Sequence, residues 1–371
     1  MSIDADDIVE GAPMGAGQLL ARAAAAEARA SARNAAAVSQ LAQPVDLWID
    51  DRTRAAIANI LSAMIAALSG EIRGYAVRAL TMQGDAALAE RLSKAAGDIE
   101  QALYRGGILN QHDLVAELIA RTMQEMIGEA LPTHAPSTDD GGSLIVRLAT
   151  APDGIVAQAA TAYLAAEARR RAPHEGNGPV RTDLPAELHH RLVWWIAAGL
   201  ASLAMGAAPA TQAQLDRVLT EAALRSLSAH DEGDRLEAAA VQLAAAIDAT
   251  PAELADLVTE ALSDRRLPLF IAVLGHALGI DYDLARDVVI DPIADRLWIA
   301  ARALDLPRAA IARIGLVLCE ADPRRDLDGF ADQIDAILAI DPAEARLALA
   351  PLKRHPDFRA AARALARGGR A

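Results

Sequence analysis

The sequence has very few of the residues that build disulfide frameworks or aromatic-rich sheets. Of its 371 residues one is a cysteine, Cys319, and aromatic residues make up 3%. A single cysteine excludes an intramolecular disulfide and every metal or redox motif that needs several cysteines. Segments in which apolar and polar residues alternate, as in half-buried strands, are almost absent. We therefore expect an all-α protein with no sheet, in a reducing compartment, the cytoplasm.

The sequence also lacks the short motifs that identify many enzymes. It contains no Walker loop and no H-E-x-x-H, G-x-S-x-G or C-x-x-C, and Leu20 stands where a dinucleotide-binding loop after Gly15 and Gly17 needs its third glycine. A run that imitates a calcium-binding loop begins with Arg324, a cation where the metal needs an oxygen ligand. We expect a protein that is not an enzyme, with no catalytic residue, cofactor or metal site.

Positive charge is scarce as well. The formal net charge is -14, and the first ten residues carry acids but no Lys or Arg. A negative field repels nucleic acid and favours basic partners, and an acidic start is the opposite of a secretory or transit peptide. We therefore do not expect nucleic acid as a partner.

Alanine and leucine supply most of the apolar residues, which total 53%, and both favour helices. The stretch 267–319 contains successive helix-period stripes, and prolines stand where first helical turns would begin. Alternate prolines in this part of the chain are about 35 to 41 residues apart, near the repeat of HEAT or armadillo units. This spacing leaves two arrangements open, HEAT-like helical-pair repeats or irregular helical lobes.

Loops rich in proline, glycine and aspartate suggest where the chain divides. We expect an acidic lead with an alanine-rich helical arm, an N-terminal helical lobe, a linker, a helical segment, a loop, a C-terminal helical-repeat lobe and a basic tail. The corresponding ranges are 1–43, 44–131, 132–142, 143–172, 173–183, 184–350 and 351–371.

The uncharged run 192–215 is long enough to suggest a membrane span, but Gly206 and Pro209 should end its helix. The remaining apolar segment is shorter than the roughly 20 residues that a span needs, so we expect no membrane span. This helix is apolar all round. Either neighbours cover it on both sides, or His190, Trp194 and Met205 form a candidate surface for a partner helix or a homodimer.

The C-terminal tail is basic, and Arg359, Arg363 and Arg367 share one helical face at four-residue spacing. This candidate basic face is interpreted either as a solvated terminal helix with cations at its negative end, or as a segment that docks on the chain itself or on an acidic partner.

Four helix-forming runs carry a family resemblance: LWIDDRTRAAIANILSAMIAALSGEIRGYAVRAL, LPAELHHRLVWWIAAGLASL, AHDEGDRLEAAA, and the stretch from LPLF through LCEADPRRD. They resemble an alphaproteobacterial, HEAT-like, all-helical bacterial family catalogued as a domain of unknown function (2336), over about residues 45–345. The resemblance implies a fold and carries over no catalytic residue.

We therefore expect a cytoplasmic helical-repeat scaffold or adaptor for protein-protein interaction, whose partner is another, basic protein or a second copy of the chain. The alternatives are a DNA-binding or signalling regulator, or a ligand sensor with a pocket between lobes.

Overall fold

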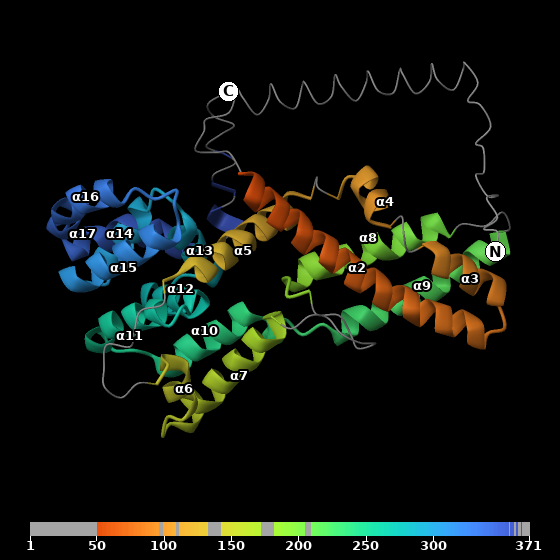
Figure 1. The fold of residues 1–371 in the computed structure, drawn as a ribbon, viewed down its shortest axis with the longest axis horizontal. Coiled ribbons are helices and arrows are strands. Elements are labelled where there is room, and N and C mark those ends of the chain that lie inside the picture. The colour runs from red at the N-terminus through yellow and green to blue at the C-terminus, as the bar shows by residue number, and fades with distance from the viewer. Residues whose placement is uncertain are drawn as a thin grey trace, which may run out of the picture. The chain divides into compact units, whose positions relative to one another are not determined.

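The computed structural model of the chain is drawn in Figure 1. It describes residues 50–95, 99–108, 111–132, 142–171, 182–204, 209–355, 357–359, 361–362 and 365. The chain divides into two units, Met1–Arg54 and Ala55–Ala371. Residues 50–54 alone are described in the first unit, so the fold below is that of the second.

The described residues form helices, turns and connecting segments, without any strand, which confirms the all-α prediction. The helices are α2 (Asp51–Met82), α3 (Ala86–Lys94), α4 (Ile99–Gly106), α5 (His112–Ala130), α6 (Leu144–Ala149), α7 (Gly154–Arg171), α8 (Ala186–Leu203), α9 (Pro209–Ala229), η4 (Glu232–Asp234), α10 (Leu236–Ile247), α11 (Pro251–Ser263), α12 (Leu267–Leu278), α13 (Tyr282–Ile290), α14 (Asp295–Ala303), α15 (Arg308–Ala321), α16 (Leu327–Ala339), α17 (Pro342–Leu349) and η5 (Ala350–Lys353).

Buried apolar side chains gather in two cores. The first core is built by α2, α3, α4, the beginning of α5, α8 and α9. The second core is built by the end of α5 together with α6, α7 and the helices from α10 to α17. Helix α5 serves both, because Leu118 lies in the first core and Ile127 in the second. The stretch 267–319, which carries the successive helix-period stripes, supplies much of the second core.

The cores cut across the predicted division of the chain. Helices α8 and α9 bury their apolar faces with α2, although the prediction grouped residues 184–350 together. Residues 133–141 and 172–181, most of the expected linker and loop, lie outside the described residues. The division into lobes stays a prediction.

Most of the proline-marked helix starts are confirmed. Pro251 and Pro342 open α11 and α17, Pro268 lies in the first turn of α12, and Pro185 and Pro307 are the residues just before α8 and α15. Proline is suited to these positions because its fixed φ matches the first turn and no helical hydrogen bond needs its missing N–H. Aspartates strengthen several of the starts, as Asp281 does by accepting a hydrogen bond from the Leu284 amide at 2.8 Å.

Two of the proline-marked starts are wrong, at Pro323 and Pro292. Pro323 does not begin a helix, because α16 starts four residues later at Leu327 with Asp326 as its cap. Pro292 does not begin a helix, because Ala294 adopts a left-handed φ of 62° and α14 starts only at Asp295, which leaves Ile293 exposed. In the sequence, the neighbouring Ser69 and Gly70 also suggest a helix break, but α2 runs without interruption from Asp51 to Met82. The leucine and isoleucine stripe on both sides of Gly70 is buried in the first core, and this burial outweighs the cost of about 1 kcal/mol for glycine in a helix.

Arginines satisfy the carbonyls at several helix ends in the second core. Arg325 and Arg324 donate to the carbonyls of Val289 and Ile290, the latter at 3.4 Å, where α13 ends. Arg346 donates to the Ala303 carbonyl at 3.0 Å, where α14 ends. A cation suits the negative end of a helix, and these contacts join helices that are distant in the sequence.

Among the described helices, α2 is long and apolar enough by composition to cross a membrane, and the bent pair α12 and α13 qualifies when counted as one span. Core helices of soluble proteins meet the same criterion. The uncharged run 192–215 does not form one long helix, as expected: α8 ends at Leu203 and α9 begins at Pro209. The absence of a membrane span stays a prediction.

Candidate functional site

The candidate surface on α8 is only partly described, because Met205 lies outside the described residues. His190 is exposed, and Trp194 is half-buried against the first core and donates from Nε1 to His190 Nε2 at 3.1 Å. Trp195, whose spacing places it on the core stripe of α8, is also only half-buried, so the two tryptophans both lie at the rim of the first core. The role of this surface in binding stays a prediction.

The candidate basic face of the tail is described at one position. Arg363 and Arg367 lie outside the described residues. Arg359 Nη2 donates to Asp281 Oδ2 at 3.0 Å, and the Arg359 side chain is 15% exposed. Of the two interpretations of the tail, this ion pair favours the self-docked one at Arg359.

The partner of Arg359 belongs to an acidic groove beside α13, with a cavity volume of about 650 Å³. Asp281 precedes α13, and Asp283 and Asp287 are one helical turn apart on it, all three exposed. The opposite wall comes from the tail and includes Phe358 and Arg359. A basic, partly apolar segment of the chain therefore lies along an acidic helix face.

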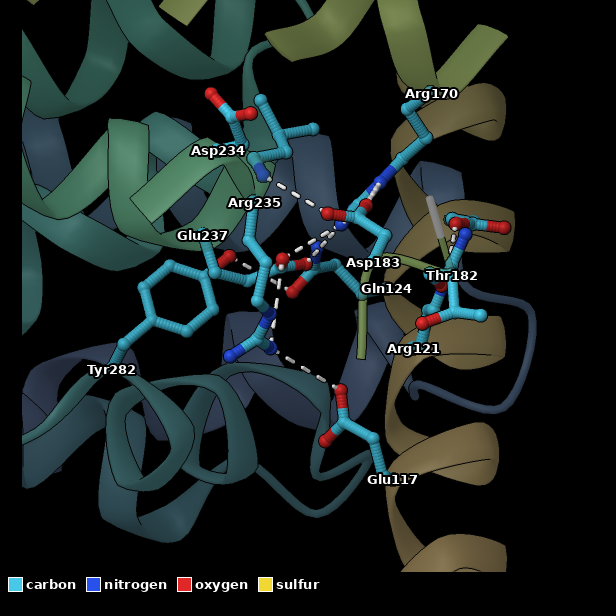
Figure 2. A network of polar contacts seen from close by, with 12 residues as sticks. Glu117, Arg121, Gln124, Arg170, Thr182, Asp183, Asp234, Arg235, Glu237 and Tyr282 are labelled. Carbon is cyan, nitrogen blue, oxygen red and sulfur yellow. Dashed lines mark hydrogen bonds and ion pairs between the residues drawn. The ribbon is translucent and has the colours of Figure 1, made fainter. Parts of the chain in front are cut away.

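A second polar feature is a buried ion-pair network, which Figure 2 shows from close by. Arg170 of α7 donates from Nη2 to both carboxylate oxygens of Glu237, at 2.7 and 2.8 Å, and also pairs with Asp183. Asp183 in turn accepts from the Leu236 amide at 3.3 Å and so caps α10. Burial alone would raise the pKa of Glu237, but the ion pair with Arg170 outweighs it and lowers that pKa to about 2.

The network continues to α5 and α13. Arg286 donates to the two carboxylate oxygens of Glu117 at 2.6 and 3.2 Å, and the side chains are 3% and 7% exposed. Arg235 lies between the Arg170–Glu237 pair and the Arg286–Glu117 pair, with its Nη2 3.7 Å from Glu117 and 3.8 Å from Glu237. Three buried arginines thus face three carboxylates inside the chain, and the exposed Asp283 and Glu232 add ion pairs to Arg286 and Arg235 at 3.1 and 3.3 Å. Tyr282 adds a hydrogen bond of 3.0 Å to Gln124 Oε1.

Two histidines stack beside this network. The His189 and His230 rings are 3.9 Å apart and nearly parallel, and His189 Nδ1 lies 2.9 Å from the Thr182 hydroxyl. Burial, and then the neighbouring His230, lower the pKa of His189 to about 4. His189 is buried whereas the adjacent His190 is exposed, so the two face different surroundings, as their helix positions require.

Two other acidic segments fill structural roles. Asp326, in the run that imitates a calcium loop, caps α16 by accepting from the Gly329 amide at 3.0 Å. In the acidic run 229–234, Asp231 caps η4 by accepting from the Gly233 amide at 2.8 Å. Nowhere in the described ranges do three His, Cys, Asp or Glu side chains gather in an arrangement that could hold a metal ion.

No pattern in the sequence predicted this network. Asp183 stood in an expected loop, and Glu117 and Arg286 are 169 positions apart. A polar residue within an apolar helix stripe was the available signal: Glu117 and Gln124 are one and three residues away from the core residues Leu118 and Ile127.

Comparison with known proteins gives one match. No curated protein and no solved structure matches the chain. The model of a family described as an uncharacterised protein conserved in bacteria (DUF2336) matches residues 142–350, which include all of α6 to α17 and the Arg170, Arg235, Glu237 and Arg286 positions of the network. The chain therefore belongs to this uncharacterised bacterial family, DUF2336.

Proposed function

We propose that this protein is a non-catalytic adaptor that binds a basic helical segment of a partner protein in the acidic groove beside α13. The observation that carries the proposal is the ion pair of 3.0 Å between Arg359 and Asp281, by which the chain's own basic segment lies in that groove. A surface that accepts one basic segment has the charge and the shape to accept another.

The chemistry of the groove supports this type of partner. Asp281, Asp283 and Asp287 supply exposed carboxylates on the α13 wall, while Leu352 and Phe358 are the apolar residues of the chain's own segment that lies against it. The Arg354 guanidinium lies 5.7 Å from the centre of the Phe358 ring, a cation-π distance. A partner helix with arginines at four-residue spacing and one aromatic side chain would reproduce these contacts.

The proposal also covers the arrangement of the helices around the groove. Four pairs of consecutive helices pack together, α8 with α9, α11 with α12, α12 with α13 and α15 with α16, while α10 packs on α7 and α12, and α14 on α17. This neighbour packing supports a HEAT-like arrangement of helical pairs, which commonly presents extended binding surfaces. We include a cytoplasmic location, for which the single half-buried cysteine is the supporting observation.

The test uses the full chain and a fluorescent peptide of residues 351–371, with binding followed by anisotropy. The Arg359→Glu variant places a carboxylate opposite Asp281, so it should release the chain's own segment and bind the added peptide more tightly than the wild type does. Adding Asp281→Asn and Asp287→Asn to this variant should weaken peptide binding about tenfold or more. Asn keeps the helix cap at position 281 and removes only its charge.

Asp335→Asn is the matched control, because Asp335 is an exposed carboxylate that pairs with Arg308 outside the groove. It should leave peptide binding unchanged. Failure of the Arg359→Glu variant to bind the peptide, or equal binding with and without the two groove aspartates, would refute the proposed adaptor site.

A further inference from the structure

A second cavity, outside the acidic groove, lies where α5, α7 and the turn between α11 and α12 meet. Its volume is about 790 Å³, within the range of small-molecule sites. Arg121, Arg170 and Arg266 supply part of its wall, and Ile60 and Leu236 supply apolar surface. The cavity adjoins the buried network, since Arg170 belongs to both.

Three residues that line this cavity carry polar atoms with no hydrogen-bond partner among the described residues. These atoms are Gln124 Nε2, Arg170 Nη1 and Arg266 Nε. Gln124 is 2% exposed and the Arg170 side chain 9%. Buried donors in folded proteins nearly always have a partner, so three unpaired ones among the lining residues call for acceptors, which water or a bound group in the cavity can supply.

The charges of the lining favour an anion. All three unpaired atoms are donors, and two of them belong to guanidinium groups. Three of the four lining carboxylates are engaged already: Glu167 pairs with Arg171 at 3.1 Å and with Arg266, Glu125 pairs with Arg121 at 2.9 Å, and Asp264 accepts from the Ser143 hydroxyl at 2.9 Å. The fourth, Glu129, is exposed. Guanidinium groups with free N–H positions match the oxygens of a phosphate or a carboxylate.

We propose that this cavity binds a small organic oxyanion, a phosphomonoester or a carboxylate attached to an apolar body. The oxyanion accepts hydrogen bonds from Gln124, Arg170 and Arg266, and the apolar body packs on Ile60 and Leu236. The site is independent of the groove beside α13 and of any protein partner.

The test titrates the full chain with phenyl phosphate, benzoate, inorganic phosphate and phenol by calorimetry, and follows the melting temperature in parallel. Phenyl phosphate or benzoate should bind saturably with one site per chain and raise the melting temperature. Which of the two binds more tightly identifies the head group. Inorganic phosphate should bind more weakly because it lacks the apolar body, and phenol should not bind because it lacks the oxyanion.

Gln124→Glu is the diagnostic variant. It keeps the oxygen that accepts from Tyr282, removes the Nε2 donor and adds a negative charge, so it should weaken binding about tenfold or more. Gln242→Glu is the matched control, because it adds the same charge on an exposed position of α10 and should leave binding unchanged. Arg171→Gln changes a lining residue whose side chain is 70% exposed, and should weaken binding even if Gln124→Glu fails to fold.

Absence of saturable binding of both phenyl phosphate and benzoate to the wild type would overturn the proposal. So would equal weakening by Gln124→Glu and Gln242→Glu, or unchanged binding in both Gln124→Glu and Arg171→Gln.

Discussion

Gly315 allows α15 to lie directly against the Phe330 ring of α16. A Cβ at this position would come within 2.1 Å of the ring, which also packs on Trp298 with the ring centres 4.6 Å apart. Gly315→Ala should therefore lower the free energy of unfolding by about 1 to 3 kcal/mol, measured by urea denaturation. Gly70→Ala is the control: a Cβ there meets nothing within 4 Å, so it should stabilise α2 by up to about 1 kcal/mol. Equal effects of the two substitutions would contradict the steric argument.

His189 should make the stability depend on pH in a defined window. Its pKa in the folded chain is about 4, below the ordinary value, because burial and the stacked His230 disfavour the charged ring. Stability is therefore full above about pH 6.5 and falls as the pH drops toward 4, by roughly 3 kcal/mol for this residue. Carboxylates such as Glu237, with a pKa of about 2, lose their contribution only at lower pH. Melting temperatures between pH 7 and pH 5 should fall less in His189→Gln than in the wild type, and parallel curves would count against this assignment.

At the scale of whole helices, the sequence predicted the helix starts, which depend on interactions between residues close together in the chain. Proline and aspartate marked the starts of α11, α13 and α17, because a helix cap involves residues within one turn. The continuity of α2 through Gly70 was missed, since it depends on burial in a core that only the folded chain creates. The network of Arg170, Glu237, Glu117 and Arg286 was missed for the same reason, because no spacing in the sequence brings α5 next to α13.

The ion pair of Glu117 and Arg286 joins α5 to α13. Removing one partner of this buried pair should cost more stability than replacing both. Glu117→Gln leaves the Arg286 guanidinium buried without its main carboxylate, and should lower the free energy of unfolding by about 3 kcal/mol in urea denaturation. Replacing both partners, with Glu117→Leu and Arg286→Met, should recover at least half of that loss, because no unpaired charge remains. A double variant less stable than Glu117→Gln would contradict this expectation, because the intact pair would then stabilise the fold by more than the cost of leaving one buried charge unpaired.

At the scale of the whole described unit, α5 and the ion-pair network connect the two cores. Leu114 and Leu118 of α5 are buried in the first core, Ile127 of the same helix is buried in the second, and so is Leu131, which directly follows the helix. Glu117 and Arg121, between these positions, contact α13 and the Thr182 carbonyl. The helix cannot unfold in one core without disturbing its residues in the other, so the cores should unfold together.

Tryptophan fluorescence can test this coupling because the two cores carry different tryptophans. Trp194 and Trp195 pack against the first core, and Trp298 is buried in the second. Trp48 is replaced by Phe in every variant. Adding Trp298→Phe leaves Trp194 and Trp195 as reporters of the first core, and adding Trp194→Phe and Trp195→Phe instead leaves Trp298 as the reporter of the second core. The two reporters should give one urea midpoint. Gly315→Ala, which disturbs only the second core, should shift the midpoint seen by Trp194 and Trp195 by as much as the midpoint seen by Trp298, because α5 transmits the loss. A shift confined to Trp298 would show that the cores unfold independently and that α5 does not couple them.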